Sequence, residues 1–170
     1  MNFNKLINTI LESNQPTKNV DHNGKERWML NGHVHRTDGP AVTHPGGTKE
    51  WWVNGKRHRE DGPAIMFMDG TEDWWVNGKR HREDGPAIVF KSGNKITGME
   101  WWRNGKRHRI DGPAYVWISR GEIFREEWWI DGEQLTGNKL QEYITKLNLK
   151  KTLAQKNDNL FDKNFIEELD

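Results

Sequence analysis

Short runs of tryptophan, valine and isoleucine alternate along most of the chain with polar residues and turn-forming glycines. One stretch, over residues 51–64, returns almost unchanged at 74–87 and again at 101–114. A degraded copy precedes them at 28–41, and a truncated one follows at 128–132. Self-similarity at a fixed period predicts a repeat array, in which each unit buries its apolar face against its neighbours.

The spacing of the units is nearly constant. The Asp-Gly-Pro-Ala element starts at residues 38, 61, 84 and 111, and the Trp pairs start at 51, 74, 101 and 128. The additional residues of the longer units enter after Ala87 and after Ala114, in the same half of the unit. We therefore expect two longer hairpins, over 88–100 and 115–127, that protrude and either grip a partner or lie against the terminal helices.

Each unit carries two turn signals. The first is Asn-Gly, at 31, 54, 77 and 104, with Asp-Gly at 131. These dipeptides favour two-residue hairpin turns because both central residues take positive φ. The second is Asp69-Gly70 with its equivalents, while Asp-Gly-Pro marks a bend, since proline donates no ladder hydrogen bond. The pattern predicts a mainly β fold, a meander of antiparallel β-hairpin repeats with two strands per unit.

The Asn-Gly turns fix the predicted register. A two-residue turn at 54–55 places Trp52 opposite Arg57, Trp51 opposite His58 and Glu50 opposite Arg59, so each copy makes an aromatic–cation pair and an acid–base pair. The degraded copy replaces the Trp/Arg pair with Met29/Val34, a joint change that supports this register. It also places Arg27 opposite Arg36, which the register does not explain. The Asp69-Gly70 turn would place Ile65 opposite Trp74 and Phe67 opposite Glu72.

Opposed residues share a face of the sheet, so the register separates two faces. One face holds the first Trp of each pair with its histidine, Ile65 and Val53, and we expect it to form the interior. The other face is more polar. It carries a column of Trp/Arg pairs that recur every ~10 Å, the spacing of two strands. We take this column as the candidate binding site: Trp52, Arg57, Trp75, Arg80, Trp102 and Arg107.

The two ends differ from the array. Apolar residues at helical spacing predict an amphipathic helix over residues 1–14, followed by a linker to residue 20. The array occupies 21–136. Residues 137–170 are expected to form a helical cap, with a capping box at Asn138 and Gln141, a polar segment over 150–159 and a last short helix. Leu135 and Gln134 replace His and Arg in the final unit, which suits contact with such a cap.

Composition narrows the range of functions. The net charge is +1, which gives no electrostatic basis for binding long nucleic acids. Cysteine is absent, which excludes disulfides and thiolate metal sites and fits a cytoplasmic location. No apolar run reaches the roughly 20 residues of a membrane span, and no signal peptide is apparent. We expect no membrane association and no cofactor.

The motif Trp-Trp-x-Asn-Gly-Lys-Arg-His-Arg-x-Asp-Gly-Pro-Ala resembles a repeat of uncharacterised phage and giant-virus proteins. It is more distantly similar to MORN repeats, including those of the bacterial YwqK-like group. The resemblance covers residues 24–136, although paired Trp and Asp-Gly-Pro replace the usual MORN glycine spacing. It implies a twisted array of β-hairpins that acts as a binding or scaffold module. The phage-like form suggests a virus-encoded protein in the cytoplasm of a bacterial host.

Two constellations could carry chemistry. His58, Arg59 and Asp61 recur in the same order in each unit, but a catalytic site is normally a single asymmetric constellation. Repetition favours a structural role, in which histidine packs on its Trp and hydrogen-bonds the turn while aspartate caps the bend or pairs with arginine. No histidine or carboxylate spacing indicates a metal site. The Trp/Arg column is the better candidate, since aromatic and guanidinium groups bind bases, phosphates and protein partners. A cross-strand cation–π brace is the alternative.

The leading hypothesis is a non-enzymatic binding protein, a phage-encoded inhibitor of a host defence protein that acts by protein–protein contact. A sponge for a nucleotide-like signalling molecule and a structural scaffold or antitoxin-like repeat protein are the alternatives. A His/Asp-dependent nuclease is the least favoured. Homo-oligomerisation through the Trp/Arg face is also possible.

Overall fold

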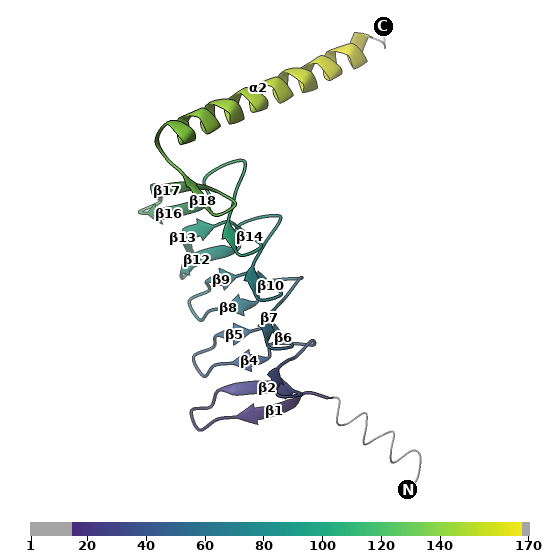
Figure 1. Ribbon diagram of the computed structural model, residues 1–170, viewed down its shortest axis with the longest axis vertical. Helices are drawn as coiled ribbons and strands as arrows, with labels where there is room; N and C mark the ends of the chain where they lie inside the picture. Colours follow the sequence, from purple (N-terminus) through teal and green to yellow (C-terminus); the bar gives the residue numbers. More distant parts are fainter. Residues whose placement is uncertain (1–14, 168–170) are drawn as a thin grey trace.

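The computed structural model describes residues 15–167, with side chains over 15–156, so the helix expected over residues 1–14 lies outside the described residues. Within that range the chain forms a tall stack of antiparallel hairpins followed by one helix (Figure 1). The predicted mainly β meander of hairpins is confirmed. The elements are β1 (Thr17–Val20), β2 (Glu26–Leu30), β3 (His33–Val34), β4 (Val42–Thr43), β5 (Lys49–Glu50), β6 (Trp52–Val53), β7 (Lys56–Arg57), β8 (Ile65–Met66), β9 (Glu72–Asp73), β10 (Trp75–Val76), β11 (Lys79–Arg80), β12 (Ile88–Ser92), β13 (Lys95–Glu100), β14 (Trp102–Arg103), β15 (Lys106–Arg107), β16 (Tyr115–Ser119), β17 (Glu122–Ile130), β18 (Glu133–Leu135) and α2 (Gly137–Glu167).

Each unit is divided between two columns of strands. The first column is a continuous antiparallel sheet in the order β1-β2-β4-β5-β8-β9-β12-β13-β16-β17. The second consists of the Asn-Gly hairpins, such as β6–β7 and β10–β11. Backbone hydrogen bonds join each hairpin to the next: the Arg59 N–H donates to the Trp75 carbonyl at 3.0 Å, and the Gly78 N–H donates to the Arg57 carbonyl at 2.8 Å. The second column is therefore also a continuous ladder.

The Asn-Gly turns have the predicted geometry. Asn54 has a φ of 49° and Gly55 a φ of 74°, and the other copies are alike. The resulting pairs, Trp52 with Arg57 and Met29 with Val34, confirm the predicted hairpin register.

The second turn is one residue longer than expected. The Phe67 N–H donates to the Thr71 carbonyl, and the Gly70 N–H donates to the Phe67 carbonyl. Because Gly70 has a positive φ of 85°, a turn followed by a bulge replaces the two-residue loop. Ile65 consequently pairs with Asp73, and Met66 pairs with Glu72. The predicted pairs Ile65/Trp74 and Phe67/Glu72 are wrong.

The buried core consists of small and aliphatic residues together with carboxylates. The alanines of the Asp-Gly-Pro-Ala elements have no exposed surface, and the residues that follow them, Val42, Ile65 and Ile88, are 4% exposed. Along the same face of the first column these aliphatic residues alternate with buried acids (Glu50, Asp73 and Glu100). The first Trp of each pair, expected to form the interior, is only half-buried.

The ends of the array differ from the sequence interpretation. Part of the expected linker, from Thr17, forms strand β1, which lies at the edge of the sheet and is exposed. At the other end α2 continues through the polar segment 150–159 as a single helix, so the predicted interruption is wrong. No Pro interrupts that segment. The Tyr143 ring meets Trp128 edge-on at 6.2 Å and its hydroxyl donates to the Ile110 carbonyl, so the first turns of α2 cap the last unit. None of the helices in the described part of the chain is long and apolar enough to cross a membrane.

Candidate binding face

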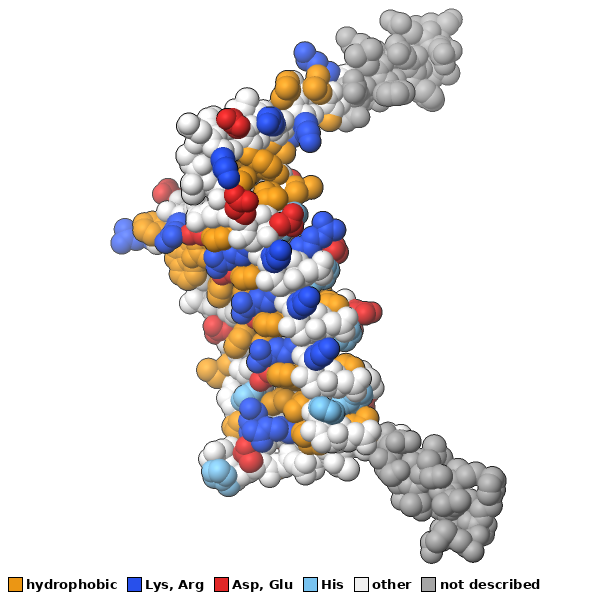
Figure 2. Space-filling model, in the orientation of Figure 1, with side chains coloured by type: hydrophobic (Ala, Val, Ile, Leu, Met, Phe, Trp, Pro, Cys, Tyr) orange, Lys and Arg blue, Asp and Glu red, His pale blue; other side chains and the backbone are white. Residues whose placement is uncertain are grey.

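The six residues predicted as a site form one column. Trp52 pairs with Arg57, Trp75 with Arg80, and Trp102 with Arg107, each across its own hairpin. Because the hairpins are joined in sequence order, these side chains follow one another along the second column. Figure 2 shows the resulting rows of basic and hydrophobic side chains on one face of the stack.

Each guanidinium in the column lies between two indole rings. The Arg57 Cζ is 4.9 Å from the ring centre of Trp52 and 5.3 Å from that of Trp75. Arg80 lies 5.0 Å from Trp75 and 5.3 Å from Trp102. The sequence analysis limited the column to three pairs, but Arg107 also reaches Trp129, at 5.5 Å. Trp75 and Trp102 therefore have a guanidinium on each side, from two successive strands.

The arginines of the column bind the buried acids of the first column. The Arg57 Nη2 donates to Glu50 Oε2 at 3.2 Å, and Glu50 is 8% exposed. Arg80 binds Asp73 at 3.2 Å, and Arg107 binds Glu100 at 3.2 Å. The predicted acid–base pairs with the other arginine of each unit (Glu50/Arg59, Asp73/Arg82 and Glu100/Arg109) are wrong. Beyond Trp51 the chain passes into the second column, so Arg59 no longer faces Glu50.

The same carboxylates accept hydrogen bonds from indole N–H groups, with one exception. Trp52 Nε1 donates to Glu50 at 3.0 Å, and Trp102 Nε1 donates to Glu100 at 2.7 Å. In the unit between them, Asp73 replaces glutamate, and Trp75 Nε1 is buried and makes no hydrogen bond of good geometry with the described residues. The side chain of Asp73 is one methylene shorter than that of glutamate.

The different contacts of Glu50 and Asp73 shift the pKa values of these two carboxyl groups in opposite directions. Burial acts to raise the pKa of Glu50, but hydrogen bonds from His44, Trp52 and Arg57 together with the Arg57 charge outweigh it, so the pKa lies below the ordinary value. For Asp73 burial outweighs the effects of the nearby Trp75 indole N–H and of Arg80, and the pKa is raised.

A second set of arginines, which the sequence analysis did not assign correctly, holds the bends. The Arg59 Cζ lies 4.2 Å from the ring centre of Trp51, its Nε donates to Asp61 at 2.9 Å, and its Nη1 donates to the Pro63 carbonyl. The hydrogen bond from Arg59 and the charge of its guanidinium hold the pKa of Asp61 below its ordinary value. The constant Arg-x-Asp-Gly-Pro spacing was the available signal. Arg36 makes the equivalent contact with Trp28, which explains why it does not oppose Arg27.

The histidines connect successive units. His58 Nδ1 accepts a hydrogen bond from the backbone N–H of Asn77 at 3.2 Å, and His81 does the same for Asn104. An accepting Nδ1 requires the neutral tautomer that carries its proton on Nε2. The expected bond to the turn exists, but it is to the turn of the next unit. Asp61 pairs with Arg59, as the structural interpretation predicted. The repeated His, Arg and Asp side chains thus all have structural contacts.

The exposed charge on the column face is positive. The acids beneath the arginines are buried, whereas Lys56, Lys79 and Lys106 are exposed at the hairpin turns. The stem of each lysine passes over the glycine of the next turn: a Cβ atom at Gly78 would lie 3.6 Å from Lys56 Cβ. Basic side chains therefore recur once per unit along this face, beside the Trp/Arg column.

A cavity of about 450 Å³ lies between the two columns, where the β8–β9 hairpin meets β12–β13. Its walls include three residues of the predicted site, namely Arg80, Trp102 and Arg107. Phe67 and Phe90 from the first column complete the aromatic part, and Asp73 contributes a carboxylate. The sequence analysis did not identify this cavity, because the predicted loop register placed Phe67 opposite Glu72.

The chain matches none of the models of known protein families and none of the curated proteins with which it was compared.

Proposed function

We propose that this chain is a non-enzymatic binding protein, encoded by a phage, that inhibits a host protein by direct contact. The viral origin rests on the resemblance of the repeat motif. The binding role is supported by one surface, the hairpin patch, defined here as Ile96, Ile123 and Phe124. These side chains belong to the two long hairpins.

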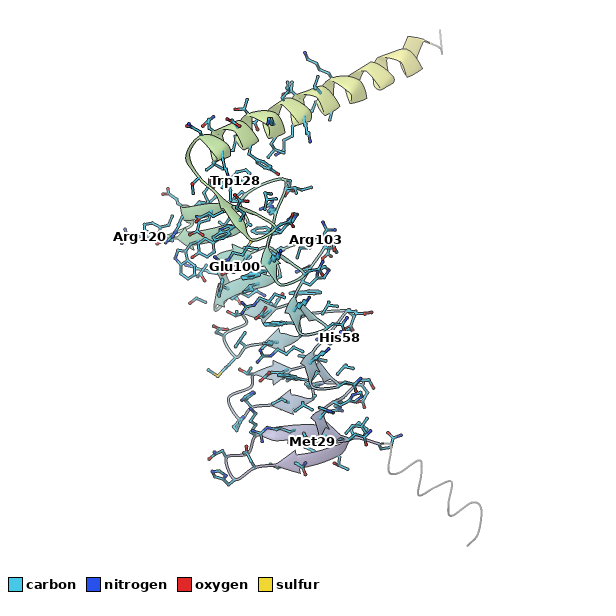
Figure 3. All side chains as sticks on the ribbon, in the orientation of Figure 1. Met29, His58, Glu100, Arg103, Arg120 and Trp128 are labelled. Atoms are coloured by element: carbon cyan, nitrogen blue, oxygen red, sulfur yellow. The ribbon has the colours of Figure 1, made fainter. Side chains whose placement is uncertain are left out.

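The apolar side chains of the hairpin patch are largely exposed and are not buried by the fold of the array. Phe124 is 76% exposed and Ile123 is 62% exposed. Figure 2 shows hydrophobic and basic side chains together at this edge, where Figure 3 labels Arg120 at the hairpin tip. Apolar side chains gathered at one edge of a soluble protein are typical of a protein-binding site. The α2 contacts described above involve Ile110 and Trp128, away from the tips.

The column face adds charge to this surface. A partner that covered both the hairpin tips and the column would meet aromatic rings flanked by Lys and Arg. Such a contact surface is apolar at its centre and polar at its rim. This distribution is typical of protein interfaces. It favours a partner whose contact surface is acidic.

The non-enzymatic part of the proposal is supported by the contacts of the His-Arg-Asp sets. In each unit the histidine accepts a backbone hydrogen bond, the arginine stacks on an indole, and the aspartate binds that arginine. A nuclease reaction would need these groups to be free for a substrate and a water molecule.

The proposal is tested by affinity capture from bacterial host lysate with three forms of the chain. These are the unmodified protein, a hairpin variant (Ile123→Asp/Phe124→Asp) and a control with equal charge added elsewhere (Leu149→Asp/Leu153→Asp on α2). We expect one host protein that the unmodified chain and the control retain and the hairpin variant loses. That protein, once purified, should lose activity when the unmodified chain is added at equimolar concentration. Capture without loss of activity contradicts inhibition, and equal capture by the hairpin variant contradicts the surface.

A further inference from the structure

Two successive units of the array differ at two positions that face the same space. The loop positions His44 and Phe67 are equivalent, because each N–H donates to the carbonyl of a threonine four residues later. The strand positions Glu50 and Asp73 are equivalent as well, since each directly precedes a Trp pair. In the earlier unit, His44 Nε2 lies 2.7 Å from Glu50 Oε1, so the two side chains join across the space between loop and strand.

In the next unit this contact is lost. The Phe67 ring has no nitrogen that could hydrogen-bond a carboxylate as His44 does. The Asp73 side chain is shorter than that of Glu50 and does not extend as far across the space. The cavity of about 450 Å³ lies at this point. Its volume falls within the range of roughly 300–1,000 Å³ that is usual for small-molecule sites. The cavity thus lies where two successive units differ in their side chains, while the backbone pattern of the repeat is kept.

The cavity combines flat apolar walls with polar groups of both kinds. Phe67, Phe90 and Trp102 supply aromatic surface. Asp73 and Glu100 are acceptors, buried to 3% and 6% exposure. Arg80 and Arg107 are donors, and Arg80 binds Asp73 through Nε and Nη2, which leaves Nη1 outside that contact. A ligand that fits these walls has a planar ring with hydrogen-bond donors and acceptors at its edge.

We infer that the cavity bounded by Phe67, Phe90 and Trp102 is a binding site for a planar nitrogen heterocycle of the nucleobase class. The ring lies against the aromatic walls, its exocyclic amino group donates to the carboxylates, and its ring nitrogen or carbonyl accepts from arginine. Aromatic walls bind any base by stacking, and the polar groups select among bases. The site recognises the ring alone, since both arginines are already bound to carboxylates.

The other units of the chain supply the test. Asp73→Glu installs the residue found at the equivalent positions 50, 100 and 127, which lengthens the side chain into the cavity and gives Trp75 Nε1 an acceptor. Phe67→His restores the second partner of the earlier unit. Both changes copy arrangements that already fold in this chain. Glu72→Asp is the matched control, because it shortens an acid on the opposite face of the same strand.

The experiment measures calorimetric binding and tryptophan fluorescence with adenosine, guanosine, cytidine and uridine, each with its 5′-monophosphate. We expect one nucleoside to bind with a stoichiometry of one per chain, and its monophosphate to bind with similar affinity. Asp73→Glu and Phe67→His should each weaken binding about tenfold or more while the melting temperature stays the same or rises, and Glu72→Asp should leave binding unchanged.

Three results overturn the inference. The first is the absence of saturable binding by any nucleoside up to millimolar concentration. The second is equal binding by the unmodified chain and Asp73→Glu. The third is binding of p-cresol, a mimic of a tyrosine side chain, without binding of any nucleoside, which would assign the cavity to an aromatic residue of a protein partner.

Discussion

The Nδ1 atom of His58 accepts a hydrogen bond from the backbone N–H of Asn77, a residue of the next repeat unit. The contact closes the turn of one hairpin onto the side chain of the hairpin before it. Equivalent contacts connect the units that follow. Stability in a repeat array depends on such terms between nearest neighbours.

Removing this acceptor should weaken the array. His58→Ala leaves the Asn77 N–H without its partner, and we expect a loss of about 1–2 kcal/mol in the free energy of unfolding. His58→Asn is the control, because the asparagine Oδ1 takes a position close to that of Nδ1 and also accepts. Urea unfolding followed by tryptophan fluorescence measures both. Equal losses in the two variants would show that ring packing, and not the hydrogen bond, connects the units.

Replacing the glycine of a bend by alanine should destabilise the protein more where the arginine guanidinium lies closer to that glycine. A Cβ atom at Gly62 would lie 2.8 Å from Arg59 Cζ, whereas one at Gly85 would lie 3.3 Å from Arg82 Cζ. Gly62→Ala must displace the guanidinium from Asp61 and Trp51, and we expect it to destabilise the protein by about 1–3 kcal/mol. Gly85→Ala should have a smaller effect, which the same unfolding measurement detects. Neither glycine has a positive φ, so backbone strain does not contribute to the comparison.

Arg80 should contribute more to stability than exposed arginines do. Arg80→Ala would leave the carboxylate of Asp73 buried without its cation, and we expect a loss of about 3 kcal/mol or more. Arg103→Ala removes an exposed ion pair with Glu83 and should change stability by less than about 1 kcal/mol. In the double variant Arg80→Ala/Asp73→Ala a large part of the loss should return. Additive losses at the two positions would contradict coupling between them.

The bends should make the protein sensitive to acid. The pKa values of Asp61 and Asp84 are held below their ordinary value of 3.8, first by hydrogen bonds from Arg59 and Arg82. A carboxyl group whose pKa is lowered on folding stabilises the protein fully above 3.8, and this contribution is lost as the pH falls through the lower folded value. Asp61→Asn/Asp84→Asn should therefore be less stable than the unmodified chain at pH 6. Its stability should also fall less steeply between about pH 4 and pH 2, in urea titrations at fixed ionic strength. Parallel curves for the two proteins would contradict this role.

The hairpin register could be predicted because it depends on local chemistry. Asn-Gly requires positive φ at two adjacent residues, and this alone determines which side chains oppose each other across 52–57 and its copies. The joint replacement of Trp and Arg by Met29 and Val34 gave an internal test of the same register, and the structure confirms it.

The remaining errors arise where the path of the chain depends on contacts between units. A residue added to the turn at Gly70 cannot be recognised from the dipeptide, since Asp-Gly suits both loop lengths. Arg59 was assigned to Glu50 because a straight hairpin would continue past Trp51, whereas the chain there enters the second column. The cavity beside Phe67 depends on both of these features, and sequence spacing contains neither. Two helices separated by a polar segment over 150–159 were expected in place of the single helix α2.

Because the bends are equivalent, the number of units sets the distance between the two ends of the array. Asp38 and Asp61 start units of the same length, each adding two strands and therefore ~10 Å along the stack. A unit inserted or deleted between two such aspartates would leave α2 and strand β1 with their present neighbours. It would change only how far apart they are held. The chain can thus be lengthened or shortened in whole steps, like a ruler whose ends stay the same while the number of divisions varies.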